Sequence, residues 1–109
     1  MTLNEELEMA RLETASKFPA LEVVVQDGSV YINFGFSIAV VLEPELMDNG
    51  RWWHAEVLEW AADHGVKDEV WIGTSQSLTD LLVLVDAWLR AYLEQEAKTQ
   101  AIIDAMPTD

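Results

Sequence analysis

Apolar residues recur at helical spacing near the start of the chain. Leu3, Leu7 and Ala10 follow one another at intervals of four and three residues, which predicts a helix over about residues 3–17. Thr2 and Glu5 stand in the positions of a capping box, in which each satisfies a backbone amide of the first turn. The chain therefore opens with a well-signalled helix.

A second helical pattern covers the end of the chain. It predicts a helix over about residues 78–105, with Ser77 as N-cap, Asp80 in the capping-box position and Pro107 beyond its end. At about 1.5 Å per residue such a helix is about 40 Å long. This is long for a chain of 109 residues.

Between the helices the pattern changes to strands. Residues 21–26 are rich in β-branched side chains, and Asp27-Gly28 is typical of a two-residue hairpin turn. Residues 29–34 then alternate polar and apolar, as in a half-buried strand. Gly35 predicts a bulge or strand switch, and residues 36–42 form a nearly continuous apolar strand, expected near the centre of the sheet.

The next region is less uniform. Pro44 is expected to break regular pairing, and residues 48–50 to form a turn. Residues 51–63 fit either a strand or a helix, but an Asn-Gly turn before them favours a strand over 51–59. Residues 69–74 are predicted to form a further short strand.

The order helix, strands, helix predicts an α+β fold in one domain, residues 1–109. We expect an N-terminal helix, an antiparallel sheet of about four to five strands, and a long C-terminal helix packed on one face. A domain of this size buries about two-thirds of the surface of its unfolded chain.

The C-terminal helix has more apolar surface than one face needs. Two stripes run along it, made of Leu78, Leu82, Val85, Leu89 and Leu93, and of Leu81, Leu84, Trp88 and Tyr92. A helix on a sheet buries roughly one stripe. Either the first helix covers the second stripe, or residues 81–93 bind a partner or form a homodimer.

The charge is strongly acidic. The chain has 20 Asp and Glu against 6 Lys and Arg, a formal net charge of −14. Such a charge keeps a protein soluble and favours positively charged partners. It argues against direct binding to nucleic acid or to an anionic membrane, where Lys and Arg must neutralise phosphates. The charge can serve solubility or binding.

The chain contains no cysteine, so it has neither disulfides nor thiolate ligands. Its acidic start lacks the basic and apolar regions of a signal peptide, and its apolar runs are too short to span a bilayer. These features lead us to expect a cytoplasmic protein.

Acidic and aromatic residues alternate in the middle of the chain and return on the last helix. Trp is enriched at interface hot spots, and adjacent Trp residues on a strand point to opposite faces. We predict a partner-binding surface made of Glu43, Glu45, Asp48, Trp52, Glu56, Glu59, Asp63, Trp88 and Tyr92. The alternative is a solvated sheet face with its loops.

Catalytic motifs are absent from the sequence. His54 and His64 are the two histidines, and neither belongs to a metal-binding or nucleophile pattern. We expect no cofactor, no metal and no enzymatic activity. A small enzyme that uses His54 and carboxylates is the alternative from another class.

In size, acidity and lack of a catalytic motif the chain resembles the small acidic inhibitors of phages and mobile elements, of the anti-CRISPR or DNA-mimic type. This resemblance implies binding to a host nucleoprotein complex, with carboxylates in place of phosphates. Glu43, Glu45, Asp48, Glu56, Glu59 and Asp63 would face the partner's Lys and Arg.

Two other classes of binding protein are similar in part. Type III secretion chaperones are small, acidic and usually dimeric, but their middle helix would have to be the ambiguous segment near residues 51–64. Immunity proteins and antitoxins use acidic surfaces to cover basic toxin sites.

Overall fold

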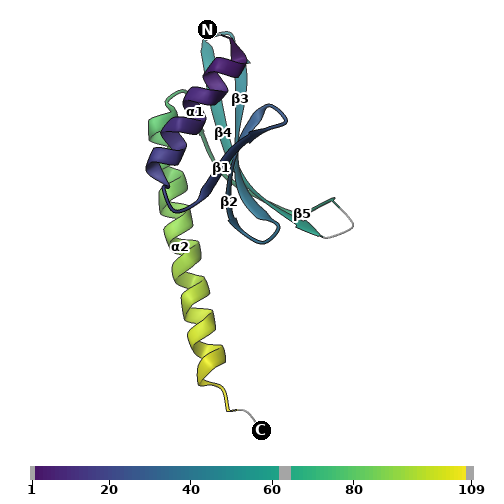
Figure 1. Cartoon of the computed structure of the whole chain (residues 1–109), viewed down its shortest axis with the longest axis vertical. Coiled ribbons are helices and arrows are strands. Elements are labelled where there is room, and N and C mark those ends of the chain that lie inside the picture. Colours follow the sequence, from purple (N-terminus) through teal and green to yellow (C-terminus); the bar gives the residue numbers. More distant parts are fainter. Residues whose placement is uncertain (1, 62–64, 108–109) are drawn as a thin grey trace.

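The chain begins and ends with a helix, and a five-stranded antiparallel sheet lies between them in sequence (Figure 1). The computed structural model describes residues 2–61 and 65–107, with Lys67 by its backbone alone. In these ranges the elements are α1 Leu3–Lys17, β1 Glu22–Gln26, β2 Ser29–Gly35, β3 Ile38–Met47, β4 Gly50–Ala61, β5 Gly65–Ser75 and α2 Leu78–Ala105. The predicted α+β architecture is confirmed, including both helix ranges.

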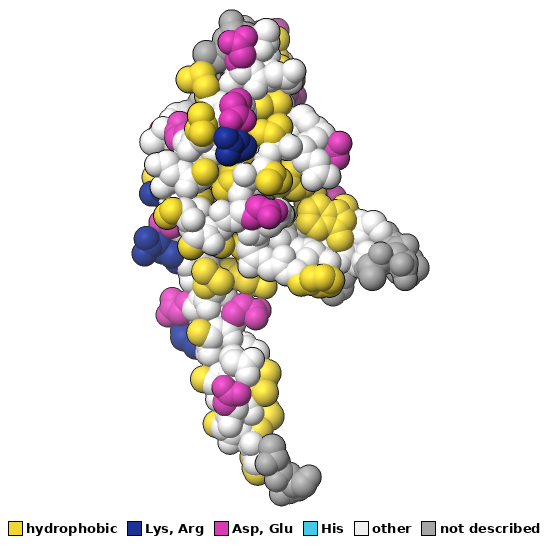
Figure 2. All heavy atoms as spheres, viewed as in Figure 1, with side chains coloured by type: hydrophobic (Ala, Val, Ile, Leu, Met, Phe, Trp, Pro, Cys, Tyr) yellow, Lys and Arg dark blue, Asp and Glu magenta, His cyan; other side chains and the backbone are white. Residues whose placement is uncertain are grey.

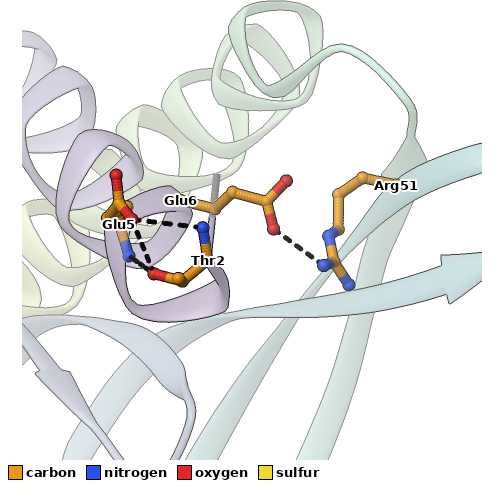
Figure 3. Close-up of polar contacts among 4 residues, drawn as sticks. All are labelled: Thr2, Glu5, Glu6 and Arg51. Atoms are coloured by element: carbon orange, nitrogen blue, oxygen red, sulfur yellow. Dashed lines mark hydrogen bonds and ion pairs between the residues drawn. The ribbon is translucent and has the colours of Figure 1, made fainter.

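Side-chain caps start both helices. The Thr2 hydroxyl accepts from the Glu5 amide at 3.2 Å, and the Glu5 carboxylate accepts from the Thr2 amide at 3.3 Å (Figure 3). At α2 the Ser77 hydroxyl accepts from the Asp80 amide at 3.2 Å. The Ser77 amide donates to the Ser75 hydroxyl instead of to Asp80, so the second capping box is only half formed.

The strands form a meander in the order β1-β2-β3-β4-β5. Asp27 and Gly28 join β1 to β2 with positive φ angles of 51° and 76°, the conformation of the predicted two-residue turn. The β2–β3 register shifts between Asn33 and Gly35, so the predicted interruption is a bulge. Two further register shifts place an extra residue in β5, near Ile72 and near Lys67.

The ambiguous segment is a strand. Residues 50–61 form β4, and a two-residue turn at Asp48 and Asn49 joins it to β3. The strand interpretation of residues 51–59 is thus confirmed. The predicted site residue Asp63 lies outside the described residues.

Two strand boundaries differ from the prediction. The strand predicted over residues 36–42 does not include its first two residues, because Ser37 adopts a positive φ of 60° and turns the chain. Phe36 is left 98% exposed. The central strand β3 starts at Ile38 instead. The strand predicted over 69–74 is longer, from Gly65 to Ser75.

Pro44 does not break the pairing, which corrects the prediction. It pairs with Trp53, and β3 continues to Met47. The Trp60 amide donates to the Ser37 carbonyl, and from there alternation points the Pro44 nitrogen away from β4. The registered β2 pairing ends at Leu42, so the missing N–H removes no ladder bond.

The core lies between the two helices and one face of the sheet, which we call the inner face. Its buried residues are Leu7, Ala10 and Phe18; Val30, Ile32, Val40, Leu42, Trp53, Ala55 and Val57; and Leu81, Leu82, Val85 and Leu89. In β4, the alternate residues Trp53, Ala55 and Val57 point inward, as expected for a strand with one buried face.

The second apolar stripe of α2 is largely covered by the protein's own sheet. Trp88 and Tyr92 both meet the ring of Phe34, with centroids 5.8 and 5.2 Å apart. Leu84 and Leu93 stay about half exposed, at 48% and 51%. Past Tyr92 every described residue of α2 is exposed, and the helix projects beyond the sheet (Figure 1).

One ion pair joins α1 to the sheet. The Arg51 guanidinium donates to the Glu6 carboxylate at 2.7 Å, and both side chains are about three-quarters buried (Figure 3). The Nε of Arg51 is buried with no hydrogen-bond partner among the described residues. Glu6 is therefore an important acceptor for the partly buried Arg51 guanidinium.

Leu81→Ala should lower the free energy of unfolding by about 2–5 kcal/mol, because Leu81 is fully buried and its removal leaves a cavity. Urea denaturation measures this. Leu93→Ala, the same change past the edge of the core, should cost much less, and equal costs would contradict the placement of α2.

Glu6→Ala should destabilise the fold by about 1–2 kcal/mol, because the partly buried Arg51 loses its acceptor. The matched control is Glu8→Ala, which removes an exposed carboxylate from the same helix, where it pairs with Arg11. Thermal unfolding of both variants separates the two cases, since loss of helix-surface charge alone would move both melting temperatures equally.

Candidate functional site

The opposite face of the sheet is covered by neither helix. We call it the outer face. It is formed by alternate residues of β2 to β5, namely Tyr31, Ala39, Val41, Glu43, Glu45, Trp52, His54, Glu56, Leu58, Trp60, Glu69, Trp71 and Thr74. The inward direction of their chain neighbours fixes this orientation.

Aromatic rings cover the middle of the outer face. Tyr31 and Trp60 stack with centroids 6.3 Å apart and an interplanar angle of 23°. They come from β2 and β4, so their rings meet above β3. This explains why Ala39 and Val41 are only 0% and 4% exposed without a covering helix. The outer face thus has a small apolar layer of its own.

Glu56 lies in a row between Tyr31 and Trp71. Across the sheet Tyr31 pairs with Val41, Val41 with Glu56, and Glu56 with Trp71. Trp71 is 59% exposed at the edge strand. A partly buried carboxylate therefore has an aromatic ring toward each side.

Carboxylates repel one another on this face. Burial raises the pKa of Glu56, and the nearby charges of Glu69 and Glu43 raise this pKa further. Burial also raises the pKa of the Tyr31 hydroxyl, with contributions from Asp27, Glu43 and Glu56. The shifts share one cause besides burial, which is a concentration of negative charge.

His54 has partners on both ring nitrogens. Its Nε2 meets the Glu45 carboxylate, and its Nδ1 lies 2.8 Å from the Thr74 hydroxyl. The ring of Trp71 lies beside it, with centroids 5.7 Å apart. The Thr74 hydroxyl also donates to the Trp53 carbonyl at 3.0 Å, which holds it in a structural bond. Glu45, His54 and Thr74 therefore form a hydrogen-bonded network across three strands. These residues line none of the three hollows described below.

The described residues contain no group of three or more His, Asp or Glu side chains arranged to hold a metal ion. His64 lies outside the described residues. Among the described residues, the carboxylates of the outer face are therefore not arranged as a metal centre.

The eight predicted site residues that the structure describes do not form one surface. Four lie on the outer face: Glu43, Glu45, Trp52 and Glu56. Asp48 lies in the β3–β4 turn. Three others, Glu59, Trp88 and Tyr92, lie on the helix side of the sheet and line a crevice of about 160 Å³.

Tyr31, Glu69 and Trp71 belong to the outer face and were missed by the sequence prediction. The signal for Tyr31 was present, because it alternates with the apolar residues of its strand. Glu69 and Trp71 gave no such signal, since their facing depends on the register shift near Ile72.

Two other hollows lie beside the helices. The larger, about 380 Å³, lies between α1 and α2, and its lining contains both Glu13 and Lys17. Thr79 donates to Glu13 across it at 2.8 Å. The other, about 270 Å³, includes the Glu6–Arg51 pair in its lining. Their mixed charges do not select a ligand of one sign.

None of the helices in the described ranges is both long and apolar enough to cross a membrane. No protein-family model, curated protein or solved structure matches the chain.

Glu56→Gln should make the protein more stable at neutral pH. The raised pKa of Glu56 means that its charged form costs folding free energy. This cost is complete above the folded-state pKa, and it disappears when the pH falls well below that pKa. The gain, seen as a small rise in melting temperature, should therefore shrink as the pH is lowered towards about 4.

Melting curves of both proteins between neutral and acidic pH measure this difference. Glu94→Gln removes the same charge from the exposed part of α2 and controls for the lower net charge. A gain that is independent of pH would show that repulsion at Glu56 is not its source.

Proposed function

We propose that the protein is an acidic binding protein whose outer face docks on a basic surface of a partner protein or nucleoprotein complex. The observation that carries the proposal is the grouping of Glu43, Glu56 and Glu69 beside Tyr31 and Trp71 on a sheet face that neither helix covers.

The distribution of positive charge supports this choice of face. The basic side chains that the structure describes lie elsewhere: Arg11 and Lys17 on α1, Arg90 and Lys98 on α2, and Arg51 on the inner side against Glu6. On the side of the molecule shown in Figure 2, acidic side chains extend from the α1 end to the projecting part of α2, and Lys and Arg side chains lie among them along the helices. Hydrophobic side chains gather between them over the middle of the molecule (Figure 2).

The chemistry of the outer face complements Arg and Lys. A carboxylate accepts hydrogen bonds from a guanidinium or ammonium group, and an aromatic face attracts the same cations. Trp and Tyr are also enriched among the few residues that dominate binding at interfaces. The surrounding charge steers a basic partner toward this face and makes the association depend on salt.

A partner surface of this kind is one that otherwise holds nucleic-acid phosphates. By occupying it, the protein would act as an inhibitor of the anti-CRISPR or DNA-mimic type. The immunity-protein alternative uses the same chemistry on a toxin. The secretion-chaperone alternative loses the middle helix on which it depended, because residues 50–61 form β4.

A labelled nona-arginine peptide is a defined probe of the outer face. We expect the triple variant Glu43→Gln, Glu56→Gln, Glu69→Gln to bind it about tenfold more weakly than the unchanged protein, measured by fluorescence anisotropy. Binding should weaken steeply between about 50 mM and about 500 mM salt, where the screening length falls severalfold.

The matched control is Glu94→Gln, Glu96→Gln, Asp104→Asn, which removes the same charge from the exposed part of α2. It should retain most of the affinity. Equal losses in the two triple variants would mean that net charge, and not the outer face, attracts the peptide. The same pair of variants then serves in pull-downs to separate specific partners from electrostatic background.

A further inference from the structure

In the described strands, the longest free edges of the sheet lie at three places. Each outer strand of the meander, β1 and β5, pairs on one side only. The third free edge is the end of β3, residues 43–47, because the registered β2 pairing stops at Leu42. A free edge presents unpaired N–H and C=O groups to any further strand, so proteins commonly block such edges. At the end of β3 the block is Pro44, which has no N–H to present there.

The free edge of β5 is blocked in two ways. The extra residues at its two register shifts interrupt the regular spacing of the edge groups. The Trp60 amide bonds to Ser37, so alternation along β4 and β5 points the Glu69 amide to the free edge. This amide donates to the Asp68 carboxylate at 2.9 Å, which engages one of the edge donors. A further strand would therefore find few regularly spaced partners along β5.

Strand β1 has none of these features. It spans Glu22–Gln26 with the sequence Glu-Val-Val-Val-Gln, and it pairs with β2 without a register shift. It contains no proline and no lysine, and its one charged residue stands at its first position. Regular strands of β-branched residues are suited to pairing with another strand when an edge is left open.

The hairpin turn determines which groups of β1 are free. Next to a two-residue turn with positive φ angles, Gln26 and Ser29 exchange both backbone hydrogen bonds. Bonding alternates from there, so Val24 bonds to β2, whereas the backbone groups of Val23 and Val25 point to the free edge. Outside the hairpin, no hydrogen bond of the described residues engages these groups.

A second copy of β1 is complementary to this edge. When two β1 strands run antiparallel about Val24, all of their residues are paired, and Val23 of each copy exchanges both backbone hydrogen bonds with Val25 of the other. The single acid, Glu22, lies opposite the uncharged Gln26 of the other copy, whose amide can donate to the carboxylate. The register therefore pairs valine with valine and acid with amide, and no like charges lie opposite one another.

We propose that the protein forms a homodimer in which β1 pairs antiparallel with β1 of a second copy, so that the two sheets join into one. Paired residues of antiparallel strands point to the same face, so the two outer faces lie on the same side of the joined sheet. The inference goes beyond the proposed function, because the edge groups of Val23 and Val25 are not part of the outer face. It holds even if the outer face binds no partner.

Net charge opposes this dimer and gives it a characteristic salt dependence. Two copies of formal net charge −14 repel each other, and salt screens the repulsion. We therefore expect association to strengthen between about 50 mM and about 500 mM salt, whereas binding of nona-arginine weakens over the same range. Because a single strand edge is a small interface, the dimer belongs with weak and reversible complexes.

Sedimentation equilibrium of the whole protein from about 10 μM to about 1 mM measures the dimer. We expect reversible dimerisation, which Val25→Lys should weaken about tenfold, because the lost valine pair occurs twice in a symmetric dimer. The added lysine lowers the negative charge, so greater repulsion between the copies cannot cause the loss. If Val25→Lys disturbs the fold, as circular dichroism would show, Val25→Pro replaces it, since the N–H that it removes belongs to the free edge.

Val70→Lys is the matched control. Val70 is 40% exposed on the blocked strand β5, and Val25 is 39% exposed on β1, so the two variants make the same charge change at equally exposed valines of the two outer strands. Val70→Lys should leave dimerisation unchanged. Hydrogen exchange is a second measurement, in which the amides of Val23 and Val25 should become protected as protein concentration rises, while Val24 is protected at every concentration.

A protein that remains monomeric at about 1 mM in high salt would overturn the proposal. A dimer that Val25→Lys leaves intact, or that Val70→Lys weakens equally, would do the same. Protection of the Val23 and Val25 amides only after a foreign protein is added would assign the edge to a strand of that protein and exclude the dimer. None of these results bears on nona-arginine binding, so the two proposals can fail separately.

Discussion

Burial of alternate side chains from β2, β3 and β4 beneath two helices determines where the other residues of these strands point. Ile32, Leu42 and Ala55 are fully buried on the inner face. Because the side-chain period of a strand is two, their neighbours must face the other way, and a slip by one residue would reverse both faces. The arrangement of acids and aromatic rings on the outer face is therefore a consequence of core packing.

Much of this could be predicted from local signals. Thr2 and Ser77 mark helix starts, and Asp27-Gly28 marks a hairpin, because these residues satisfy backbone requirements within a few positions. The prediction that Pro44 breaks the pairing was wrong, because the effect of a proline depends on which edge of its strand still has a partner.

The site was predicted less well. Residues near position 56 were found, but Glu69 and Trp71 were not, since their facing depends on a register shift that only the paired strands define. Glu59, Trp88 and Tyr92 were assigned to one surface with Glu56, although the sheet separates them.

The charge of the protein acts against its own stability on the outer face. Burial raises the pKa of Glu56, and the two nearby carboxylates of Glu69 and Glu43 raise it further, so its charged form is disfavoured. Two apolar residues, Ala39 and Val41, are nonetheless kept from water there by Tyr31 and Trp60. The outer face thus has enough packing to remain ordered while it keeps an unfavourable concentration of charge, a combination common where stability and function compete.

The projecting part of α2 gives the molecule two levels of cooperativity. Up to Tyr92 the helix is anchored by core contacts, so its amides should exchange with solvent only when the whole domain opens. Beyond that point its residues are exposed, and the helix depends on its own propensity and on pairs such as Glu94–Lys98. Exchange protection should therefore fall along one continuous helix. A partner that grips only the last turns could unwind or rebuild them without disturbing the sheet.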